Sequence, residues 1–160
     1  MKTAVLSLLL ALPFFVAAQT SDSLIVIKQI DSLLRQLRPL IEQQKLDAAL
    51  ETLNFAEEKS LATFGKNHAA FAACLAFRGK IAQREEKYKE AEALYLDAMS
   101  IQEKVFGKQS PQYAISLSNL STVYLTVGEF AKAEPVTLEA LAIREKLVGK
   151  QHPDYARVLG

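Results

Sequence analysis

An eight-residue phrase that returns at a fixed interval constrains the fold of this chain more than any other feature. It reads GKQSPQYA at Gly107–Ala114 and GKQHPDYA at Gly149–Ala156, with a more divergent copy, GKNHAAFA, at Gly65–Ala72. The copies begin at positions 65, 107 and 149, which defines a constant 42-residue period. A fixed period of this size is typical of a helical solenoid, in which each repeat is a small unit that stacks on its neighbours. The sequence therefore predicts an all-α array whose register is set by this phrase.

The residues between the copies predict two helices per repeat. Apolar residues recur three and four positions apart, and half of the 160 residues are apolar, with no Trp and only six Gly. This pattern and composition favour helices. Each repeat closes at its Gly, which suits a left-handed C-cap, and Ser110-Pro111 supplies an N-cap and a first-turn proline. The expected helices cover residues 21–43, 46–63, 69–84, 88–105, 110–127 and 130–148, with a seventh opening at His152-Pro153.

Small residues at repeated positions indicate how these helices pack. Residues 87–114 and 129–156 are identical at 13 of 28 positions. Alanines lie seven positions apart on one face of each second helix, namely Ala91 and Ala98, then Ala133 and Ala140. A larger side chain there would hold neighbouring helices apart. Gly79 and Ser121 take the matching place in the first helices. Because no single unit can bury its apolar face alone, stability must come from stacking.

The first twenty residues predict a secretory signal peptide. Lys2 precedes a mainly apolar run, Ala4–Ala18, which is interrupted by Pro13 and ends in small residues. Such a run suits a signal that is removed from the mature chain. We expect cleavage after Ala18, a secreted or periplasmic protein, and no stable membrane span after cleavage. The alternative is a retained N-terminal membrane anchor, for which the run is short.

The chain accordingly divides into three segments. Residues 1–18 are the expected signal peptide, residues 19–45 a degenerate capping helix, and residues 46–160 the repeat array, whose last repeat is incomplete. Within the capping helix we expect Pro39 to kink the helix or to end its regular part near Arg38, because proline lacks an N–H and disfavours a helical residue before it.

No pattern in the chain predicts catalysis, a cofactor or a metal. A formal net charge of +1 gives no reason to expect nucleic acid as a partner. Cys74 has no second cysteine to pair with and lies among alanines and a leucine, which predicts a small buried side chain. His68 and His152 occupy equivalent helix starts, with no further His or Cys at ligand spacing. We therefore expect no catalytic residues, no metal site and no cofactor.

Four segments together resemble a known repeat family. They are Lys87–Glu92 (KYKEAE), Leu117–Leu120 (LSNL), Ala140–Lys146 (ALAIREK) and Gly149–Asp154 (GKQHPD). They are similar to the 42-residue tetratricopeptide repeats of kinesin light chains and of many bacterial proteins. The resemblance implies a right-handed superhelical solenoid of antiparallel helix pairs. It also implies a non-catalytic scaffold that binds a protein or peptide in its concave groove. Because we expect secretion, a motor role does not carry over.

The resemblance further implies which side chains line that groove, since the first helix of each pair faces it. The candidates are Phe77, Lys80, Arg84, Ile115, Asn119, Thr122 and Thr126. Asn119 resembles a groove asparagine that bridges a peptide backbone, because its amide both donates and accepts hydrogen bonds. The alternative for Asn119 is a surface or interhelix role. Lys80 and Arg84, with Arg35 and Arg38 on the preceding helix, would favour an acidic ligand, or else are ordinary solvated charges.

Two other readings of the function stay open at this point. In the first, the chain is the N-terminal fragment of a larger enzyme, for example a caspase-like protease that carries a repeat domain. A coding sequence that continues past Gly160 with a His/Cys pair would favour this alternative. In the second, the chain is a structural module that self-associates through an open C-terminal edge of the array. A monomer in sedimentation experiments would reject that alternative.

Overall fold

The computed structural model describes residues 6–149 of the chain. Within this range the chain forms helices and no strands, so the predicted all-α fold class is confirmed. The helices are α1 (Leu6–Glu42), α2 (Leu46–Phe64), α3 (Ala69–Arg84), α4 (Tyr88–Phe106), α5 (Pro111–Thr126) and α6 (Phe130–Val148). Five of these match the expected helices to within a residue or so at each end. The expected seventh helix at His152-Pro153 lies outside the described residues.

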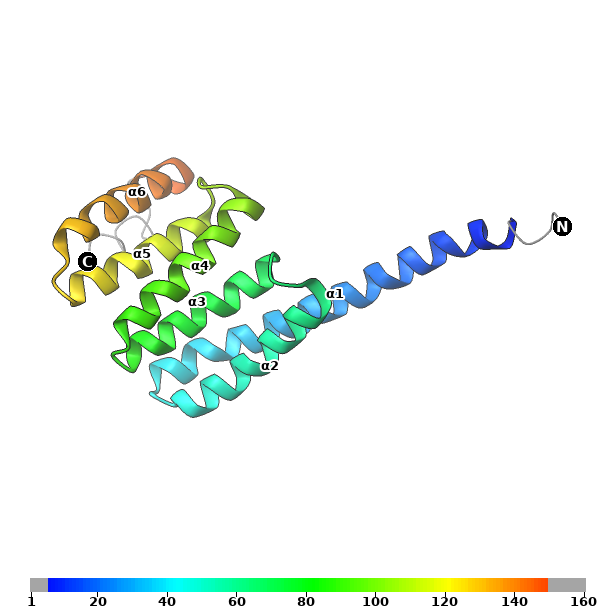
Figure 1. Ribbon diagram of the computed structural model, residues 1–160, viewed down its shortest axis with the longest axis horizontal. Coiled ribbons are helices and arrows are strands. Elements are labelled where there is room, and N and C mark those ends of the chain that lie inside the picture. The colour runs from blue at the N-terminus through cyan, green and yellow to red at the C-terminus, as the bar shows by residue number, and fades with distance from the viewer. Residues whose placement is uncertain (1–5, 150–160) are drawn as a thin grey trace.

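The helices form three antiparallel hairpins that stack in chain order. Figure 1 shows α1 with α2, α3 with α4, and α5 with α6, each pair lying beside the next. In the same view the N-terminal part of α1 extends away from the other helices, because α1 has 37 residues and α2 only 19. Within the part of the chain that the structure describes, no helix is long and apolar enough to cross a membrane.

The first helix starts earlier than expected and settles one of the two outcomes expected at Pro39. It begins at Leu6, well before the expected start near Ser21, and it continues through Pro39 to Glu42. Of the two outcomes expected at Pro39, an end of the helix near Arg38 is therefore wrong. Pro39 is exposed, whereas Leu37 and Ile41 on either side of it are fully buried. Burial of these two side chains against α2 holds the last turn in helical geometry, and this outweighs the one hydrogen bond that proline cannot donate.

The links between hairpins have the caps that the sequence predicts. Gly107 ends α4 with φ of +80°, a conformation that a side chain would strain, and its N–H donates to the Glu103 carbonyl at 2.9 Å. Ser110 then caps α5, because its Oγ accepts a hydrogen bond from the Tyr113 N–H at 3.3 Å. One repeat earlier His68 takes the same role through Nδ1, which accepts from the Ala70 N–H at 3.1 Å.

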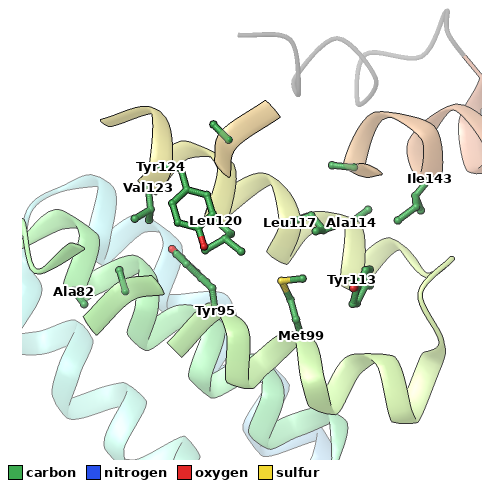
Figure 2. Close-up of a cluster of buried hydrophobic side chains, with 13 residues drawn as sticks. Ala82, Tyr95, Met99, Tyr113, Ala114, Leu117, Leu120, Val123, Tyr124 and Ile143 are labelled. Carbon is green, nitrogen blue, oxygen red and sulfur yellow. The ribbon is translucent and has the colours of Figure 1, made fainter. Parts of the chain in front are cut away.

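The apolar core consists of three clusters that follow the stack. The first joins α1, α2 and α3 and includes Ile30, Leu53 and Cys74; the second joins α3 to α4 through Phe71 and Ala98. The third joins α3, α4, α5 and α6, and Figure 2 shows its Tyr95 and Met99 on α4 near Leu117 and Leu120 on α5. The four alanines expected at close helix contacts, Ala91, Ala98, Ala133 and Ala140, are all buried. Stacking therefore buries the apolar faces, as the repeat pattern requires.

Candidate binding groove

A hollow of about 500 Å³ opens on the face that the first helices of the hairpins share. Its walls come mainly from α1, α3 and α5, and the last turns of α6 also contribute to its lining. The lining residues are Arg38, Glu42, Ala76, Phe77, Lys80, Pro111, Ala114, Ile115, Ser118, Asn119, Thr122, Arg144 and Leu147. The three first helices reach one hollow because they lie in register, so that residues one repeat apart in sequence stand in equivalent places.

The structure brings five of the seven predicted groove residues together. Phe77, Lys80, Ile115, Asn119 and Thr122 all line this hollow. Arg84 and Thr126 do not; each lies four residues further along its helix, in the last turn of α3 or α5. That these seven side chains contact a ligand stays a prediction.

Sequence reasoning missed part of the lining. Arg144 and Leu147 come from α6, a second helix, whereas only first helices were expected to face the groove. Arg144 follows Ser60 and Gln102 at the repeat interval, and all three are polar at a position that is buried in the first two units. The recurrence of a polar residue at this repeat position is the sequence signal that could have identified Arg144 as part of the lining. Glu42, in the last turn of α1, was also missed.

The charges of the hollow are mostly positive. Its lining includes three basic residues, Arg38, Lys80 and Arg144, and a single carboxylate, that of Glu42. Lys80 is half-buried, and burial lowers the pKa of its ammonium group. The nearby charges of Arg38 and then Arg84 lower the same pKa further, while Glu42 opposes them. A desolvated cation beside two like charges is a favourable place for an anionic group to bind.

The α5 wall is uncharged and has its hydroxyl groups arranged in a row. Ser118 Oγ donates to the Ala114 carbonyl at 2.9 Å, and Thr122 Oγ1 donates to the Ser118 carbonyl at 2.9 Å. Thr126 Oγ1 continues the row by donating to the Thr122 carbonyl at 2.8 Å. Each hydroxyl hydrogen is thus used inside the helix. Ser118 Oγ in addition accepts from Arg144 Nη2 at 3.4 Å, so the lone pairs of the two threonine oxygens are what the row can offer outward.

Apolar surface and one amide complete the site. Ile115 is 49% exposed on the α5 side, and Phe77 on α3 is half-buried. Asn119 is also half-buried, and its side chain has no hydrogen-bond partner among the described residues. An amide in this position can accept and donate at once, which is what pairing with a peptide backbone needs. Over residues 6–149 no group of three or more His, Cys, Asp or Glu residues could hold a metal ion.

Residues 71–146 match the family model described as tetratricopeptide repeat. This segment covers α3, α4, α5 and most of α6. It therefore includes the α3 and α5 walls of the groove. No functionally curated protein matches the chain.

Solved structures agree on the fold. A kinesin light chain candidate from Podosopora anserina with nearly identical TPR-like repeats has a TM-score of 0.71 at 20% identity, over 81% of this chain and 61% of that one. A substituted form of the same protein gives 0.70 at 19% identity, over 81% of this chain and 61% of that one. BtubC (BKLC) from P. vanneervenii gives 0.55 at 17% identity, over 83% and 62%. The chain thus spans about three fifths of the length of these proteins.

Proposed function

We propose that this chain, whose residues 71–146 match the tetratricopeptide-repeat model and whose fold is similar to that of kinesin-light-chain-like repeats, is a scaffold. It would bind an extended peptide segment of a partner protein in the hollow between α1, α3 and α5. Tetratricopeptide repeats in general mediate protein–protein binding, and arrays of this type are typically non-catalytic. The single observation that carries the proposal is the convergence of Phe77, Lys80, Asn119 and Thr122 on one hollow.

The chemistry of the hollow supports a peptide as the ligand. Phe77 and Ile115 offer apolar area, Asn119 offers an amide that can pair with backbone groups, and the cations offer sites for carboxylates. This combination of apolar contacts with a few polar groups is typical of ligand-binding sites. We propose that the described part of the chain does no chemistry. The single cysteine, Cys74, is buried and has its thiol pKa raised to about 12 by that burial, which is the opposite of an activated nucleophile.

We also propose that the protein acts outside the cytoplasm. The support is the N-terminal sequence, with Lys2, the apolar run and the small residues before Gln19. Mass spectrometry of the chain recovered from its native host should find Gln19 as the first residue. A chain that retains Met1 and fractionates with membranes would replace this proposal with the anchor alternative.

A second function, self-association through the α6 edge, is favoured by one observation. Phe130 is 67% exposed, whereas Tyr88, which stands at the same place one repeat earlier, packs against the third core cluster. Leu138 on α6 is also 58% exposed. Sedimentation equilibrium of the purified chain and of its Phe130→Ser variant tests this function. A dimer that dissociates in the variant would support self-association, and a monomer in both would reject it.

The experiment for the main proposal uses a display library of random 12-residue peptides, selected on the purified chain. Selected peptides should bind the Asn119→Ala variant more weakly by about 1–3 kcal/mol, while the melting temperature of the variant barely moves. Asn67→Ala is the matched control, because Asn67 is exposed in the link between α2 and α3. Equal binding by the wild-type chain and both variants would place the ligand elsewhere and overturn the proposal.

A further inference from the structure

A second hollow (the outer hollow), of about 600 Å³, opens where α2 of the first hairpin meets α3 of the second. Its lining residues are Asn54, Glu57, Glu58, Leu61, Ala62 and Arg78, none of which lines the groove. Arg78 precedes Lys80 by two residues, which places the two side chains about 200° apart around α3. The outer hollow therefore lies on the side of α3 that is turned away from the groove.

Arg78 connects α3 to two polar side chains of α2 in the outer hollow. Its Nε donates to Glu57 Oε2 at 3.1 Å, and its Nη2 donates to the same oxygen and, at 2.8 Å, to Asn54 Oδ1. The Glu58 carboxylate has no hydrogen-bond or ion-pair partner among the described residues. Arg78 thus neutralises Glu57, and two carboxylates against one guanidinium give the lining a formal charge of −1. The uncompensated charge in the outer hollow is that of Glu58.

The contact between the second and third hairpins is apolar at the same places. The residues that stand one repeat after Asn54, Glu57 and Arg78 are Leu96, Met99 and Leu120. Met99 and Leu120 are buried in the third core cluster, in which Figure 2 shows both. Well-packed apolar residues at a partly buried place are often as stabilising as an ion pair, or more so. The polar residues between α2 and α3 are thus not needed for packing, which is typical of residues that serve binding.

The part of α2 that lines the outer hollow combines the Glu58 charge with apolar surface. Leu61 and Ala62 follow Glu58 by three and four residues, so they lie one helical turn from it on the same side of α2. An arginine or lysine can lay its methylene stem on such a surface while its charged head stays in water at the rim. A guanidinium also pairs with a carboxylate through two parallel hydrogen bonds, which an ammonium group cannot do. The outer hollow therefore suits an arginine side chain best.

We propose that the outer hollow binds an arginine of a partner protein, with the guanidinium on the Glu58 carboxylate and the stem on Leu61 and Ala62. Arg78 holds Glu57 and Asn54 in place, so Glu58 decides which sign of charge the hollow attracts. The proposal goes beyond the groove and does not depend on it, because the two hollows share no lining residue. A chain with both hollows occupied would connect two partners on opposite sides of α3.

The first test measures the charged contact with the random 12-residue library. Selection on the Asn119→Ala variant disfavours peptides that bind in the groove. The selected peptides should share an arginine, and changing this arginine to glutamine should weaken binding about threefold to tenfold at low salt. Glu58→Gln, added to the same variant, should weaken binding as much and should remove the effect of the arginine. Glu51→Gln is the matched control, because Glu51 is exposed on α2 but does not line the outer hollow.

A second test asks whether the polar residues between α2 and α3 serve binding. Asn54→Leu, Glu57→Met and Arg78→Leu together give this contact the residues that stand one repeat later. The triple variant should unfold at the same urea concentration as the wild-type chain or at a higher one. Its binding of the arginine peptides should weaken about fivefold or more, because apolar side chains would then fill the outer hollow.

Three results would overturn the proposal. One is a selection on Asn119→Ala that yields no peptide dependent on an arginine. Another is an arginine peptide that binds equally well with and without Glu58→Gln, because the guanidinium would then bind elsewhere. The third is full binding by the folded triple variant. If the triple variant does not fold, Glu58→Gln alone decides, since it leaves the hydrogen bonds of Arg78 in place.

Discussion

Gly79 on α3 lies directly against the ring of Tyr95 on α4. A Cβ atom added to Gly79 would stand 2.9 Å from Tyr95 Cε1, closer than such atoms approach in proteins. The equivalent pair one repeat later is Ser121 and Thr137, whose hydroxyl groups hydrogen-bond to each other. One repeat earlier it is Leu37 and Leu53, both fully buried. The same contact between paired helices is therefore made by three different residue pairs. In each pair the size of one residue limits the size of the other.

Gly79→Ala tests this contact. Alanine is the better helix former by about 1 kcal/mol, yet Tyr95 is fully buried and its ring cannot move aside cheaply. We expect overpacking to outweigh the better helix propensity of alanine and to lower the free energy of unfolding by about 1–3 kcal/mol. Urea unfolding of the variant measures this change.

The same substitution in a Tyr95→Leu background supplies the control. Leucine is what stands at the equivalent position in the first hairpin, and it leaves room beside residue 79. Gly79→Ala should then cost much less than it does in the wild-type chain. An equal cost in both backgrounds would show that the ring contact is not the reason for glycine at this position.

The turns within the hairpins predict a stabilising substitution. Gln44, Glu86 and Gly128 stand at equivalent places, with φ of +60°, +61° and +78°. Glycine adopts this left-handed conformation without the steric cost that other residues meet. We expect relief of this cost in Glu86→Gly to raise the free energy of unfolding by about 0.5–1 kcal/mol. The extra conformational entropy of glycine in the unfolded chain subtracts part of this gain. Gly128→Ala should lower the free energy of unfolding by a similar amount. A lower urea midpoint for Glu86→Gly would contradict this prediction.

The thiol of Cys74 should report opening of the first core cluster. Burial, and then the nearby carboxylate of Glu57, raise its pKa to about 12, while Arg78 opposes the shift. At pH 8 the reactive thiolate would be about one part in ten thousand. Labelling by a disulfide reagent should thus be slower in the native chain than in urea by orders of magnitude. Because the chain has one cysteine, the signal has one source. Complete labelling on mixing would contradict the buried position.

Tyr124 predicts how stability changes at alkaline pH. Burial, and then the hydrogen bond that its hydroxyl donates to Glu92 Oε1 at 2.8 Å, raise its pKa from 10.0 to about 12. Below pH 10 both folded and unfolded forms are protonated, so this group adds no pH dependence. Between pH 10 and 12 the unfolded chain ionises first, and stability falls as pH rises.

A Tyr124→Phe variant should therefore lose less stability between these two pH values than the wild-type chain. Glu92→Gln keeps the shape of the partner but removes its charge, so the pKa of Tyr124 should move part of the way back toward 10. Unfolding measured across this range, with tyrosinate absorbance, checks both. Identical pH profiles for the wild-type chain and Tyr124→Phe would contradict the assigned shift.

The repeat phrase and the apolar spacing between its copies were enough to predict most of the fold. Gly65 and Gly107 end helices where expected, and Ser110 and His68 cap the helices that follow them. These features are local, because they depend on backbone conformation and on one or two nearby hydrogen bonds. Whether α1 would continue past Pro39 was not predictable in the same way, since the turn around Pro39 is held by burial of Leu37 and Ile41 against another helix.

The groove was predictable only in part for a related reason. The repeat register by itself relates Lys80 to Thr122 and Phe77 to Asn119 as equivalent positions of neighbouring first helices. It does not reveal how far the hollow extends along each helix, so Arg84 and Thr126 were included although they do not line it. Nor does it reveal that Arg144 reaches the site from α6, which depends on how two hairpins pack in space.

All three core clusters include residues of α3. Ile81 belongs to the cluster with α1 and α2, Leu75 to the cluster with α4, and Ala82 to the cluster that extends to α6. A solenoid can in principle melt from one end, unit by unit. Here the unfolding of α3 would remove core contacts from the first hairpin and from the third hairpin at once. The described array should consequently behave as a single cooperative unit, with its slowest amide exchange in α3 and not in the terminal hairpins.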